Sequence, residues 1–435
     1  MKSANSLTLK KINKVEGQVI LPGSKSLSNR ALLLSALASG RTRLLNVLKS
    51  DDTARMIEAL QKLDVHLSVN TSSVDVEGLG GCFDKGLNQV ELDLGNAGTA
   101  MRPLAAALAV SKGQFKLTGE ARMMERPIGP LTEALKELGL RIEYLNNDGY
   151  PPLLIHGTKP ARHETSIDGS LSSQFISALL MTAPVCGGLK IKVEGDLISK
   201  PYVDLTVALI EKFGARVKRR GYNEFEVADT GYTSPGSYLI EGDASAATYF
   251  AAAAAVCGKV EIYGVGANSL QGDAQFFDVL AKMGAKVKRL ENSVVVEKGD
   301  LKGIDIDLNN MPDAAMTLVP LSLYTSGPVT ITNIGSWRIK ETDRIDAMAM
   351  EMRKLGVKVE SGRDFISIDA SVRNKETPVF DTYNDHRMAM CMSLVALDRD
   401  IIINNPDCTS KTFPGYFKVL SSIAHQVLSK GSILK

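Results

Sequence analysis

Two patterns of hydrophobic and polar positions recur along the chain at intervals of about 70 to 75 residues. In the first pattern, an amphipathic helical stretch ends at an apolar residue, which is followed by a turn residue and an alternating strand. The turn residue is usually glycine, which readily forms the left-handed cap of a helix, so each copy predicts a helix, a stop and a strand. The five turn positions are Asp64, Gly139, Gly214, Gly284 and Gly356.

In the second pattern, a short strand leads through a polar loop into a helix rich in small apolar residues. Helices such as AAAAAVC at 251–257 are apolar almost all round, which predicts burial, whereas the amphipathic helices of the first pattern should coat the outside. The last amphipathic copy, near 419–430, has decayed, and the N-terminal strands LTLKKI and GQVILPG are candidates to complete it. The six segments of the second pattern are 22–40, 95–110, 168–184, 242–258, 310–327 and 384–399.

These patterns predict an α/β protein of six units of about 72 residues, each with two helices. One ring of six units and two groups of three units both satisfy the pattern, although a length of 435 residues mildly favours two domains. Closing the last repeat with the first strands of the chain would make one domain discontinuous. A repeat scaffold without any chemistry is the alternative that the repeats alone leave open.

Composition and charge narrow the class of function. The chain has 44% hydrophobic residues and a formal net charge of +2, which is ordinary for a globular protein and predicts no nucleic-acid partner. The five cysteines form no CxxC pair, and the histidines show no metal-ligand spacing, so we expect no metal and no cofactor. No apolar run approaches the ~20 residues of a membrane span, and the N-terminus lacks a signal-peptide core. A cytoplasmic monomer without a membrane partner is therefore expected.

Cationic side chains lie at or near several of the predicted helix N-termini. A helix N-terminus carries about half a positive charge, so a cation there is disfavoured by ~0.3–1 kcal/mol. For any single residue a solvated loop cation is the simpler interpretation. Recurrence at matching repeat positions instead predicts bound small anions, with phosphate or carboxylate groups suited to arginine. The cations are Lys25, Arg30, Arg122, Arg126, Lys200, Lys340, Arg344, His386 and Arg387.

Two carboxylates and one polar helix start are candidates for a functional site. Asp313, in MPDAAM, is most simply interpreted as a helix N-cap. Glu341 lies between Lys340 and the cap candidate Thr342, in a cation-rich segment, and is a plausible proton-transfer group. The segment SLSSQF begins a helix with a cluster of capping residues, which leaves Gln174 available to contact a ligand.

Nine short strings spread over nearly the whole chain carry a resemblance to a known family. They are LPGSKSLSNRALLL (21–34), LGNAGTAMRPL (94–104), GEARMMERPIG (119–129), DGSLSSQF (168–175), SKPYVDLT (199–206), PDAAMT (312–317), WRIKETDR (337–344), YNDHRMAM (383–390) and KTFPGYF (411–417). Together they resemble the 5-enolpyruvylshikimate-3-phosphate (EPSP) synthase family, also called 3-phosphoshikimate 1-carboxyvinyltransferases.

The resemblance implies two similar domains of three repeats each. The first would cover residues 25–240, and the second would combine residues 1–24 with residues 241–435, so that the chain crosses twice between them. The buried helices would point their N-termini into a cleft between the domains, which closes around the ligands and excludes water.

The resemblance also implies an enzyme of the shikimate pathway, which leads to chorismate and the aromatic amino acids. The family transfers the enolpyruvyl group of phosphoenolpyruvate to the 5-hydroxyl of shikimate 3-phosphate and releases phosphate, by addition and elimination through a tetrahedral intermediate. By motif, Glu341 would donate a proton to the methylene carbon, and Asp313 would take or orient the hydroxyl proton. Lys25 would bridge both substrates and offset developing charge.

The binding residues implied by the resemblance form two sets. Gly98 is among them, where a missing Cβ would let backbone N–H groups approach a ligand closely. For shikimate 3-phosphate the set is Lys25, Ser26, Arg30, Ser172, Ser173, Gln174, Ser199, Tyr202, Asp313 and Lys340. For phosphoenolpyruvate the set is Lys25, Gly98, Arg126, Gln174, Arg344, His386, Arg387 and Lys411.

One position departs from the family pattern, and one loop matches it in a way that bears on inhibition. Ser336 stands before Trp337 where the family commonly has asparagine, so a direct contact there is expected to be lost or mediated by water. The loop NAGTAMRP carries Gly98 and Pro103 in the pattern that accompanies glyphosate sensitivity in this family. We therefore expect glyphosate to inhibit the enzyme.

Two other functions compete with this interpretation. The related UDP-N-acetylglucosamine enolpyruvyl transferases share the repeat fold but typically use a loop cysteine as their acid, and the corresponding segment 115–127 contains none. The second alternative is a non-catalytic anion-binding scaffold. It is disfavoured because Lys25, Asp313, Glu341 and Arg387 are all present.

Overall fold

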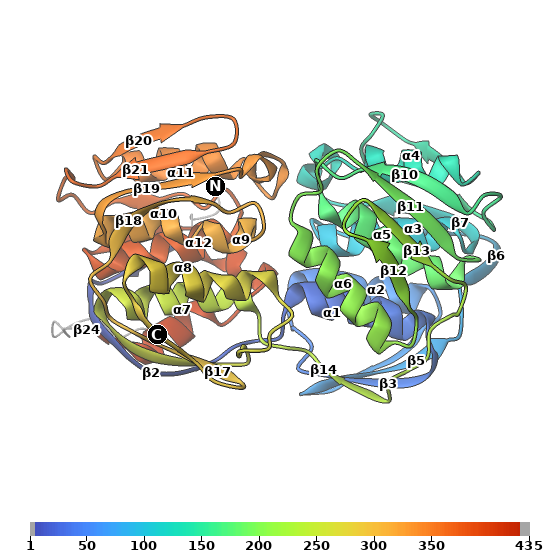
Figure 1. Ribbon diagram of the computed structural model, residues 1–435, viewed down its shortest axis with the longest axis horizontal. Coiled ribbons are helices and arrows are strands. Elements are labelled where there is room, and N and C mark those ends of the chain that lie inside the picture. Colours follow the sequence, from blue (N-terminus) through green and yellow to red (C-terminus); the bar gives the residue numbers. More distant parts are fainter. Residues whose placement is uncertain (1–4, 427–435) are drawn as a thin grey trace. The chain divides into compact units, whose positions relative to one another are not determined.

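The computed structural model describes residues 5–426, and the chain divides into two compact units. The continuous unit is Gly23–Glu241. The discontinuous unit combines the chain up to Pro22 with the chain from Gly242, so the backbone passes between the units twice. Each unit contains three β-sheets among the described residues, as Figure 1 shows, which confirms an α/β fold built from two groups of three repeats.

The three sheets of the continuous unit share one topology. In each, two strands pair in parallel and the second is followed by an antiparallel pair. In the second and third sheets a buried helix joins the two parallel strands, whereas in the first sheet the parallel partner, Ser237–Leu239, comes from the end of the unit. The strand orders are β14 (Ser237–Leu239), β3 (Ser39–Leu45), β5 (Ser73–Leu79), β4 (His66–Val69); β6 (Asp84–Asp93), β7 (Lys112–Thr118), β9 (Leu153–Gly157), β8 (Arg141–Tyr144); and β10 (Glu164–Asp168), β11 (Leu189–Glu194), β13 (Glu224–Val227), β12 (Val217–Arg220).

The discontinuous unit repeats this topology, with additions from both ends of the chain. As in the continuous unit, a buried helix joins the two parallel strands in the second and third sheets. The last sheet has three strands among the described residues, fewer than the others. The orders are β16 (Lys286–Arg289), β17 (Ser293–Glu297), β15 (Gly258–Tyr263), β2 (Ile12–Ile20), β24 (Ala424–Gln426); β18 (Lys302–Asp307), β19 (Ser326–Thr332), β21 (Ile366–Asp369), β20 (Lys358–Ser361); and β1 (Ser6–Leu9), β23 (Ile401–Asn404), β22 (Val379–Phe380).

The two N-terminal strands join different sheets. Strand β1, in the string LTLKKI, pairs antiparallel with β23 and completes the last repeat, as the sequence predicts. Strand β2, which contains most of the second string, pairs antiparallel with β24 of the decayed last copy, and on its other side it pairs in parallel with β15 of the fourth repeat. In Figure 1 this dark-blue strand lies in a sheet otherwise drawn in later colours. The decayed helix near 419–430 is α13 (Tyr416–Ile423), and its string runs beyond the described residues after 426.

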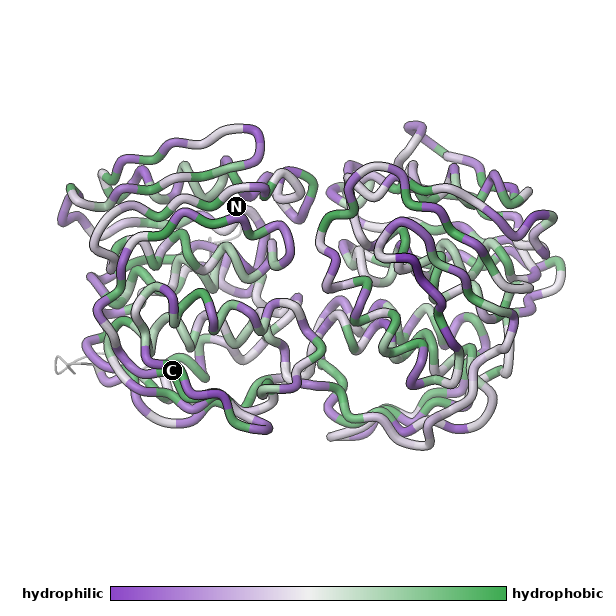
Figure 2. The backbone as a smooth tube through the Cα atoms, in the orientation of Figure 1, coloured by the Kyte–Doolittle hydropathy of each residue, from purple (hydrophilic) through white to green (hydrophobic). Residues whose placement is uncertain are grey.

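Each unit encloses helices that are apolar almost all round, as expected from the second sequence pattern. In α1 and α7 nearly every side chain is buried, and Figure 2 shows hydrophobic colour along these helices. The fifth repeat differs, because Pro320 has no N–H to continue the helical hydrogen bonds, and the helix is broken into two short pieces. The buried helices are α1 (Lys25–Leu37), α3 (Gly98–Ala109), α5 (Ser173–Thr182), α7 (Ala244–Cys257), α9 (Pro312–Ala315), α10 (Leu318–Leu321) and α12 (His386–Ser393).

The amphipathic helices bury one side and end where the sequence predicts. All five turn residues have left-handed backbone, with φ of 65°, 87°, 87°, 116° and 73° in chain order, which confirms the predicted stops. Each turn leads into an antiparallel strand. The helices are α2 (Asp51–Lys62), α4 (Gly129–Glu137), α6 (Lys200–Lys212), α8 (Phe276–Met283) and α11 (Arg344–Arg353).

The apolar side chains form two separate cores, one in each unit. The only tryptophan of the sequence, Trp337, is fully buried in the core of the discontinuous unit, and its Nε1 donates a hydrogen bond to the carbonyl of Pro312 (2.7 Å). None of the helices within residues 5–426 combines the length and the hydropathy that crossing a membrane requires.

The left-handed turn at Gly284 gives a first prediction. A Cβ at this position would lie 2.4 Å from the carbonyl oxygen of Asp300, on a backbone with φ of 116°. We expect Gly284→Ala to lower the free energy of unfolding by about 1–2 kcal/mol for the left-handed backbone and about 1–3 kcal/mol more for the overlap. The measurement is urea unfolding of the wild-type and variant proteins.

Gly327→Ala is the matched control for this prediction. Gly327 also has left-handed backbone, with φ of 99°, but nothing lies within 4 Å of the position that a Cβ would take there. Its substitution should therefore show only the backbone cost of about 1–2 kcal/mol. Equal losses in the two variants would contradict the role assigned to the contact with Asp300.

Candidate active site

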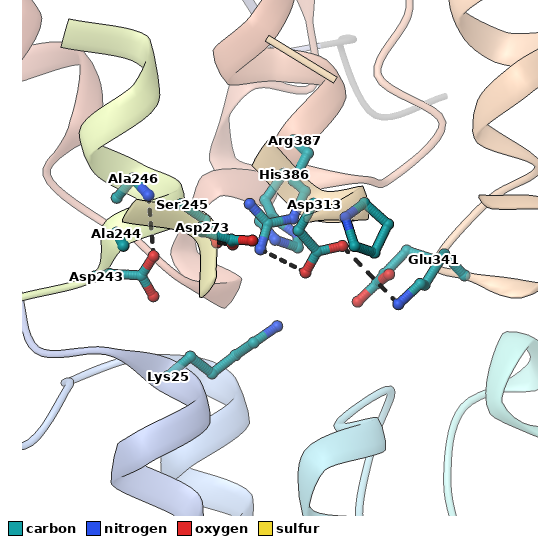
Figure 3. A network of polar contacts seen from close by, with 12 residues as sticks. Lys25, Asp243, Ala244, Ser245, Ala246, Asp273, Asp313, Glu341, His386 and Arg387 are labelled. Atoms are coloured by element: carbon teal, nitrogen blue, oxygen red, sulfur yellow. Dashed lines mark hydrogen bonds and ion pairs between the residues drawn. The ribbon is translucent and has the colours of Figure 1, made fainter. Parts of the chain in front are cut away.

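In the discontinuous unit, two buried arginines and three carboxylates form one network at the N-terminal ends of α9, α11 and α12. Arg344 donates from Nη1 to Asp313 (2.9 Å), from Nη2 to Glu341 (3.0 Å) and from Nε to Asp385 (2.7 Å). Arg387 donates from Nη2 to the other oxygen of Asp313 (2.9 Å), as Figure 3 shows. Asp313 therefore bridges two guanidinium groups.

The electrostatics of the network depend on Arg344, whose side chain is only 1% exposed. Burial disfavours its charge, but Asp385, Glu341 and Asp313 outweigh burial and raise the pKa of this guanidinium above its ordinary value. Arg344 is thus a permanent buried cation. Removing one of its three carboxylates would leave one donor of the Arg344 guanidinium without its charged partner, in a medium of low dielectric constant.

Two capping assignments made from the sequence are wrong. The N-cap of α9 is Met311, and Asp313 lies within the first turn, where its carboxylate accepts from arginines instead of backbone N–H groups. The N-cap of α11 is Asp343 and not Thr342, since the Asp343 side chain accepts from the N–H of Asp346 (3.2 Å). In both cases a residue near the predicted one in the chain occupies the cap.

Two members of the network were missed by sequence reasoning. Asp385 is fully buried and caps α12, and its place directly before a helical run was the available signal. The hydroxyl of Tyr249 lies 3.3 Å from Nη1 of Arg387. Nothing marked Tyr249 in advance, because it sits inside the alanine-rich helix α7 and pairs with a residue 138 positions away.

A further buried carboxyl group, that of Asp273, lies near Asp313. Asp273 is buried in the 3-10 helix Gly272–Gln275 and accepts a hydrogen bond from the hydroxyl of Ser245 (Figure 3). Burial and the charge of Asp313 raise the pKa of Asp273 to about 6, although Ser245 and Arg387 oppose the shift and Asp243 adds to it. Sequence reasoning missed this group as well.

The other predicted residues of this unit lie around the network. His386 is the first residue of α12 and is fully buried, with Nδ1 3.5 Å from Asp385. Lys340 Nζ lies 3.9 Å from Asp313. Lys411 is buried at the end of the 3-10 helix Pro406–Lys411.

In the continuous unit, the predicted residues of the first repeat lie on α1. Ser24 caps this helix, and Lys25, its first residue, is buried with Nζ 3.3 Å from Asp52 of α2. One turn further along, Arg30 donates from Nε to the hydroxyl of Thr206 (2.9 Å) and from Nη1 to the carbonyl of Ser26 (3.1 Å).

Arg30 is a buried cation whose described partners are all neutral. It is 4% exposed, and burial lowers the pKa of its guanidinium to about 10, with Tyr202 opposing the shift. It still carries its charge at neutral pH, and no carboxylate within residues 5–426 forms an ion pair with it. An anionic ligand would supply the missing countercharge.

Arg126 is the second such arginine. It is also 4% exposed and donates from Nη1 to the backbone and side-chain oxygens of Asn96 (3.0 and 2.9 Å). Its buried Nε has no hydrogen-bond partner among the described residues. A Cβ on Gly98 would lie 2.7 Å from Nη2 of Arg126 and 2.9 Å from Nη1 of Arg102. The glycine therefore makes room for guanidinium groups over the start of α3, a reason that the sequence did not suggest.

The third repeat of this unit presents hydroxyl and amide groups. Ser172 caps α5 by accepting from the N–H of Gln174 (3.2 Å), which confirms the predicted cap, and Ser173 begins the helix. Ser199 is the N-cap of α6 and has φ of 53°, an uncommon left-handed conformation for serine that costs about 1–3 kcal/mol. Tyr202 follows in the first turn of the same helix.

Two of the predicted cations have ordinary surroundings. Arg122 forms a 2.8 Å ion pair with Glu125 three residues later. Lys200 lies with Nζ 5.4 Å from the ring centre of Tyr222. These two contacts do not favour a bound anion over the simpler interpretation.

The helix N-termini of the two units differ in their charge. In the continuous unit, α1, α3 and α5 have no acidic residue in the first turn and are capped by Ser24, Ala97 and Ser172. In the discontinuous unit, Asp243 caps α7 and Asp385 caps α12. The first set keeps the positive field of the helix ends, whereas aspartate caps offset this field in the second set.

Two solved structures that share this fold are named as enolpyruvyl transferases. EPSP synthase from Acinetobacter baumannii superposes with a TM-score of 0.79 at 24% identity, covering 96% of this chain and 98% of that one. The enolpyruvyl transferase NikO from Streptomyces tendae gives a TM-score of 0.78 at 18% identity, covering 97% and 98%. At these identities the likeness shows the fold.

Sequence comparison gives the family. The EPSP synthase (3-phosphoshikimate 1-carboxyvinyltransferase) family profile matches residues 9–420. The 3-phosphoshikimate 1-carboxyvinyltransferase of Vibrio atlanticus is 54% identical over 428 residues, which are 96% of this chain and 99% of the relative. That of Tolumonas auensis is 52% identical, over 97% and 100%. The chain belongs to the EPSP synthase family.

The raised pKa of Asp273 gives a prediction for stability against pH. The unfolded carboxyl titrates near 3.8 and the folded one near 6, so between these values the native state holds a proton that the unfolded state has released. The contribution of Asp273 to the free energy of unfolding therefore falls as the pH rises through this window, and it becomes level above it. Asp273→Asn removes the effect, so its stability relative to wild type should improve by about 2 kcal/mol from pH 4.5 to pH 7.5.

Urea unfolding of both proteins across this pH range measures the difference. The control is Asp278→Asn, which changes an exposed carboxylate on α8 that pairs with Arg289. This variant should show no comparable improvement. A difference between wild type and Asp273→Asn that stays constant with pH would contradict the shift.

Proposed function

We propose how the described residues carry out the reaction of this enzyme, which transfers the enolpyruvyl group of phosphoenolpyruvate to shikimate 3-phosphate in the shikimate pathway. The observation that carries the assignment is the contrast between two kinds of buried arginine. Arg30 and Arg126 have only neutral partners among the described residues, whereas Arg344 and Arg387 are held by carboxylates. The first pair suits anionic ligands, and the second surrounds the proton-transfer groups.

Shikimate 3-phosphate is proposed to bind mainly through the continuous unit. Its phosphate needs cations and N–H or hydroxyl donors, and its ring hydroxyls need polar partners. Arg30 provides charge, and Ser172 and Ser199 lie at helix N-termini. The full proposed set is Lys25, Ser26, Arg30, Ser172, Ser173, Gln174, Ser199 and Tyr202, together with Asp313 and Lys340.

Phosphoenolpyruvate carries a phosphate and a carboxylate, so its proposed set is rich in cations. The set is Lys25, Gly98, Arg126, Gln174, Arg344, His386, Arg387 and Lys411. A substrate anion at Arg344 competes with Glu341 for Nη2, which donates to that carboxylate at 3.0 Å. Loss of this donor makes it easier for Glu341 to hold a proton, which the first chemical step requires.

In the addition step, Glu341 gives its proton to the methylene carbon of phosphoenolpyruvate. The 5-hydroxyl oxygen bonds to the neighbouring carbon, and Asp313 accepts or orients the hydroxyl proton. In the elimination step, the new methyl group returns a proton to the enzyme, and the bond to phosphate breaks, which leaves the enol ether. Lys25 offsets the charge that develops on the substrates. Each proton-transfer group should contribute about 10²–10⁴-fold to the rate.

The setting of the enzyme is proposed from the sequence. A net charge of +2 supports the absence of a nucleic-acid partner. We propose a monomer in the cytoplasm.

Phosphate release tests the reaction and the roles of the acids. We expect phosphoenolpyruvate to release phosphate with shikimate 3-phosphate but not with UDP-N-acetylglucosamine. Glu341→Gln and Asp313→Asn should each lower kcat by about 10²–10⁴-fold, because each removes a proton-transfer group while keeping the side-chain shape. The control is Glu297→Gln on β17, which changes an exposed ion pair with Lys259. This variant should keep the wild-type rate.

Each other outcome points to a named alternative. Release only with the UDP-sugar would place the protein with the related transferases despite the missing cysteine. No release with either acceptor would revive the anion-binding scaffold. Full activity of Glu341→Gln would exclude it as the proton donor.

Glyphosate inhibition is a separate prediction from the loop that carries Gly98. The compound bears a phosphonate and a carboxylate, so the cations proposed for phosphoenolpyruvate should bind it as well. We expect inhibition that weakens as phosphoenolpyruvate is raised, measured by phosphate release over a glyphosate titration. Unchanged turnover at millimolar glyphosate would contradict it.

A further inference from the structure

Two consecutive residues before α12 have a left-handed backbone conformation. Tyr383 and Asn384 have φ of 52° and 54°. Within residues 5–426, most other non-glycine residues of this kind are asparagine or aspartate, which tolerate it, and no other two are adjacent. A bulky aromatic residue is disfavoured there, so contacts elsewhere must hold Tyr383 in place. The full set is Asn46, Asp64, Ser199, Asn333, Tyr383, Asn384 and Asn405.

This turn sets the position of the residues that follow it. The N–H of Asp385 donates to the carbonyl of Thr382 (2.8 Å), which closes the turn. Asp385 then binds Arg344 and accepts from the backbone N–H of Arg387 (2.9 Å). A change at the turn therefore moves both arginines of the network.

A buried carboxylate on α11 holds the turn from one side. Glu351 is fully buried and accepts from the hydroxyl of Tyr383 (2.6 Å) and from the N–H of Asp381 (3.1 Å). Lys354 Nζ lies 2.7 Å from the same carboxylate. Burial and Glu351 raise the pKa of the Tyr383 hydroxyl above its ordinary value, so it keeps its proton and remains a donor.

Strand β23 and the residue after it hold the turn from the other side. Asn404 Nδ2 donates to Asp381 (2.8 Å), and Asn405 Nδ2 donates to Asn384 (3.3 Å). These are exposed contacts, whereas the carboxylate of Glu351 is inaccessible to water. The part-buried hydrogen bonds to Glu351 are therefore the stronger restraint on Tyr383.

We propose that Glu351 is a positioning residue for the reaction, which holds Tyr383 in its left-handed conformation and thereby sets Asp385, Arg344 and Arg387 for phosphoenolpyruvate. This inference rests on the proposed function, in which the two arginines bind that substrate. Glu351 does not touch the substrate in this account. It acts through the turn at 381–385.

The test uses Tyr383→Phe, which removes the hydroxyl and keeps the ring. We expect kcat/KM for phosphoenolpyruvate to fall about 10- to 100-fold, because small misplacements of binding groups have effects of this size. The KM for shikimate 3-phosphate should change less than about threefold, since most of its proposed contacts lie in the continuous unit. Peptides covering 381–387 should exchange their amide hydrogens faster than in the wild type.

Tyr324→Phe is the matched control. Tyr324 is also half-buried in the discontinuous unit, and its hydroxyl donates to the carbonyl of Leu394 at 2.8 Å, which lies at the C-terminal end of α12 and not at the turn. It should lower the melting temperature by a similar amount and leave the KM for phosphoenolpyruvate unchanged. Glu351→Gln, which keeps an acceptor for Tyr383 but loses the charge, should shift the same parameters in the same direction as Tyr383→Phe.

The outcomes separate the positioning role from the function itself. An unchanged KM and unchanged exchange at 381–387 in Tyr383→Phe would overturn the proposal, and so would equal kinetic losses in Tyr324→Phe. A wild-type enzyme without turnover would refute the proposed function. Amide exchange would then still report whether Glu351 holds the turn, since it needs no substrate.

Discussion

A buried guanidinium group must find negative charge, and the two units meet this constraint in opposite ways. Arg344 binds three carboxylates supplied by α9, the segment before α11 and the cap of α12, so one cation ties together three elements of the discontinuous unit. Arg30 and Arg126 have neutral partners among the described residues. The first arrangement balances the buried charge with the protein's own carboxylates, whereas in the second no ion pair among the described residues balances it.

The repeat explains why this division is possible. Each repeat within residues 5–426 provides a buried helix, broken into two pieces in the fifth repeat, and a helix N-terminus carries a partial positive charge whatever its sequence. Aspartate caps on α7 and α12 cancel that field, while Ser24 and Ser172 leave it available. The capping residue therefore decides whether a helix N-terminus at the same scaffold position keeps or offsets the field that suits an anion.

Local signals predicted the elements well, because glycine caps and apolar periodicity act within a few residues. The stops at Gly139 and Gly284 and the buried helix α7 are examples. The wrong predictions are helix caps, such as Asp313, which accepts from Arg387, 74 positions away, instead of capping its own helix. Pairings distant in sequence were not predicted at all, and an example is strand β2, which joins β15 more than 230 positions away. A single sequence holds no local trace of such partners, so only the types of the site residues were predictable, and not their contacts.

The repeat pattern could not predict the left-handed turn at Tyr383. Its conformation is unfavourable for tyrosine by any local rule, so propensity alone would place another residue there. The hydroxyl explains the choice, since a glycine would relieve the backbone but would leave the buried Glu351 without one of its donors. The strained backbone of Tyr383 and the hydrogen-bonded carboxylate of Glu351 are thus parts of one arrangement. Both follow from the position that Asp385 needs in order to accept a hydrogen bond from Arg344.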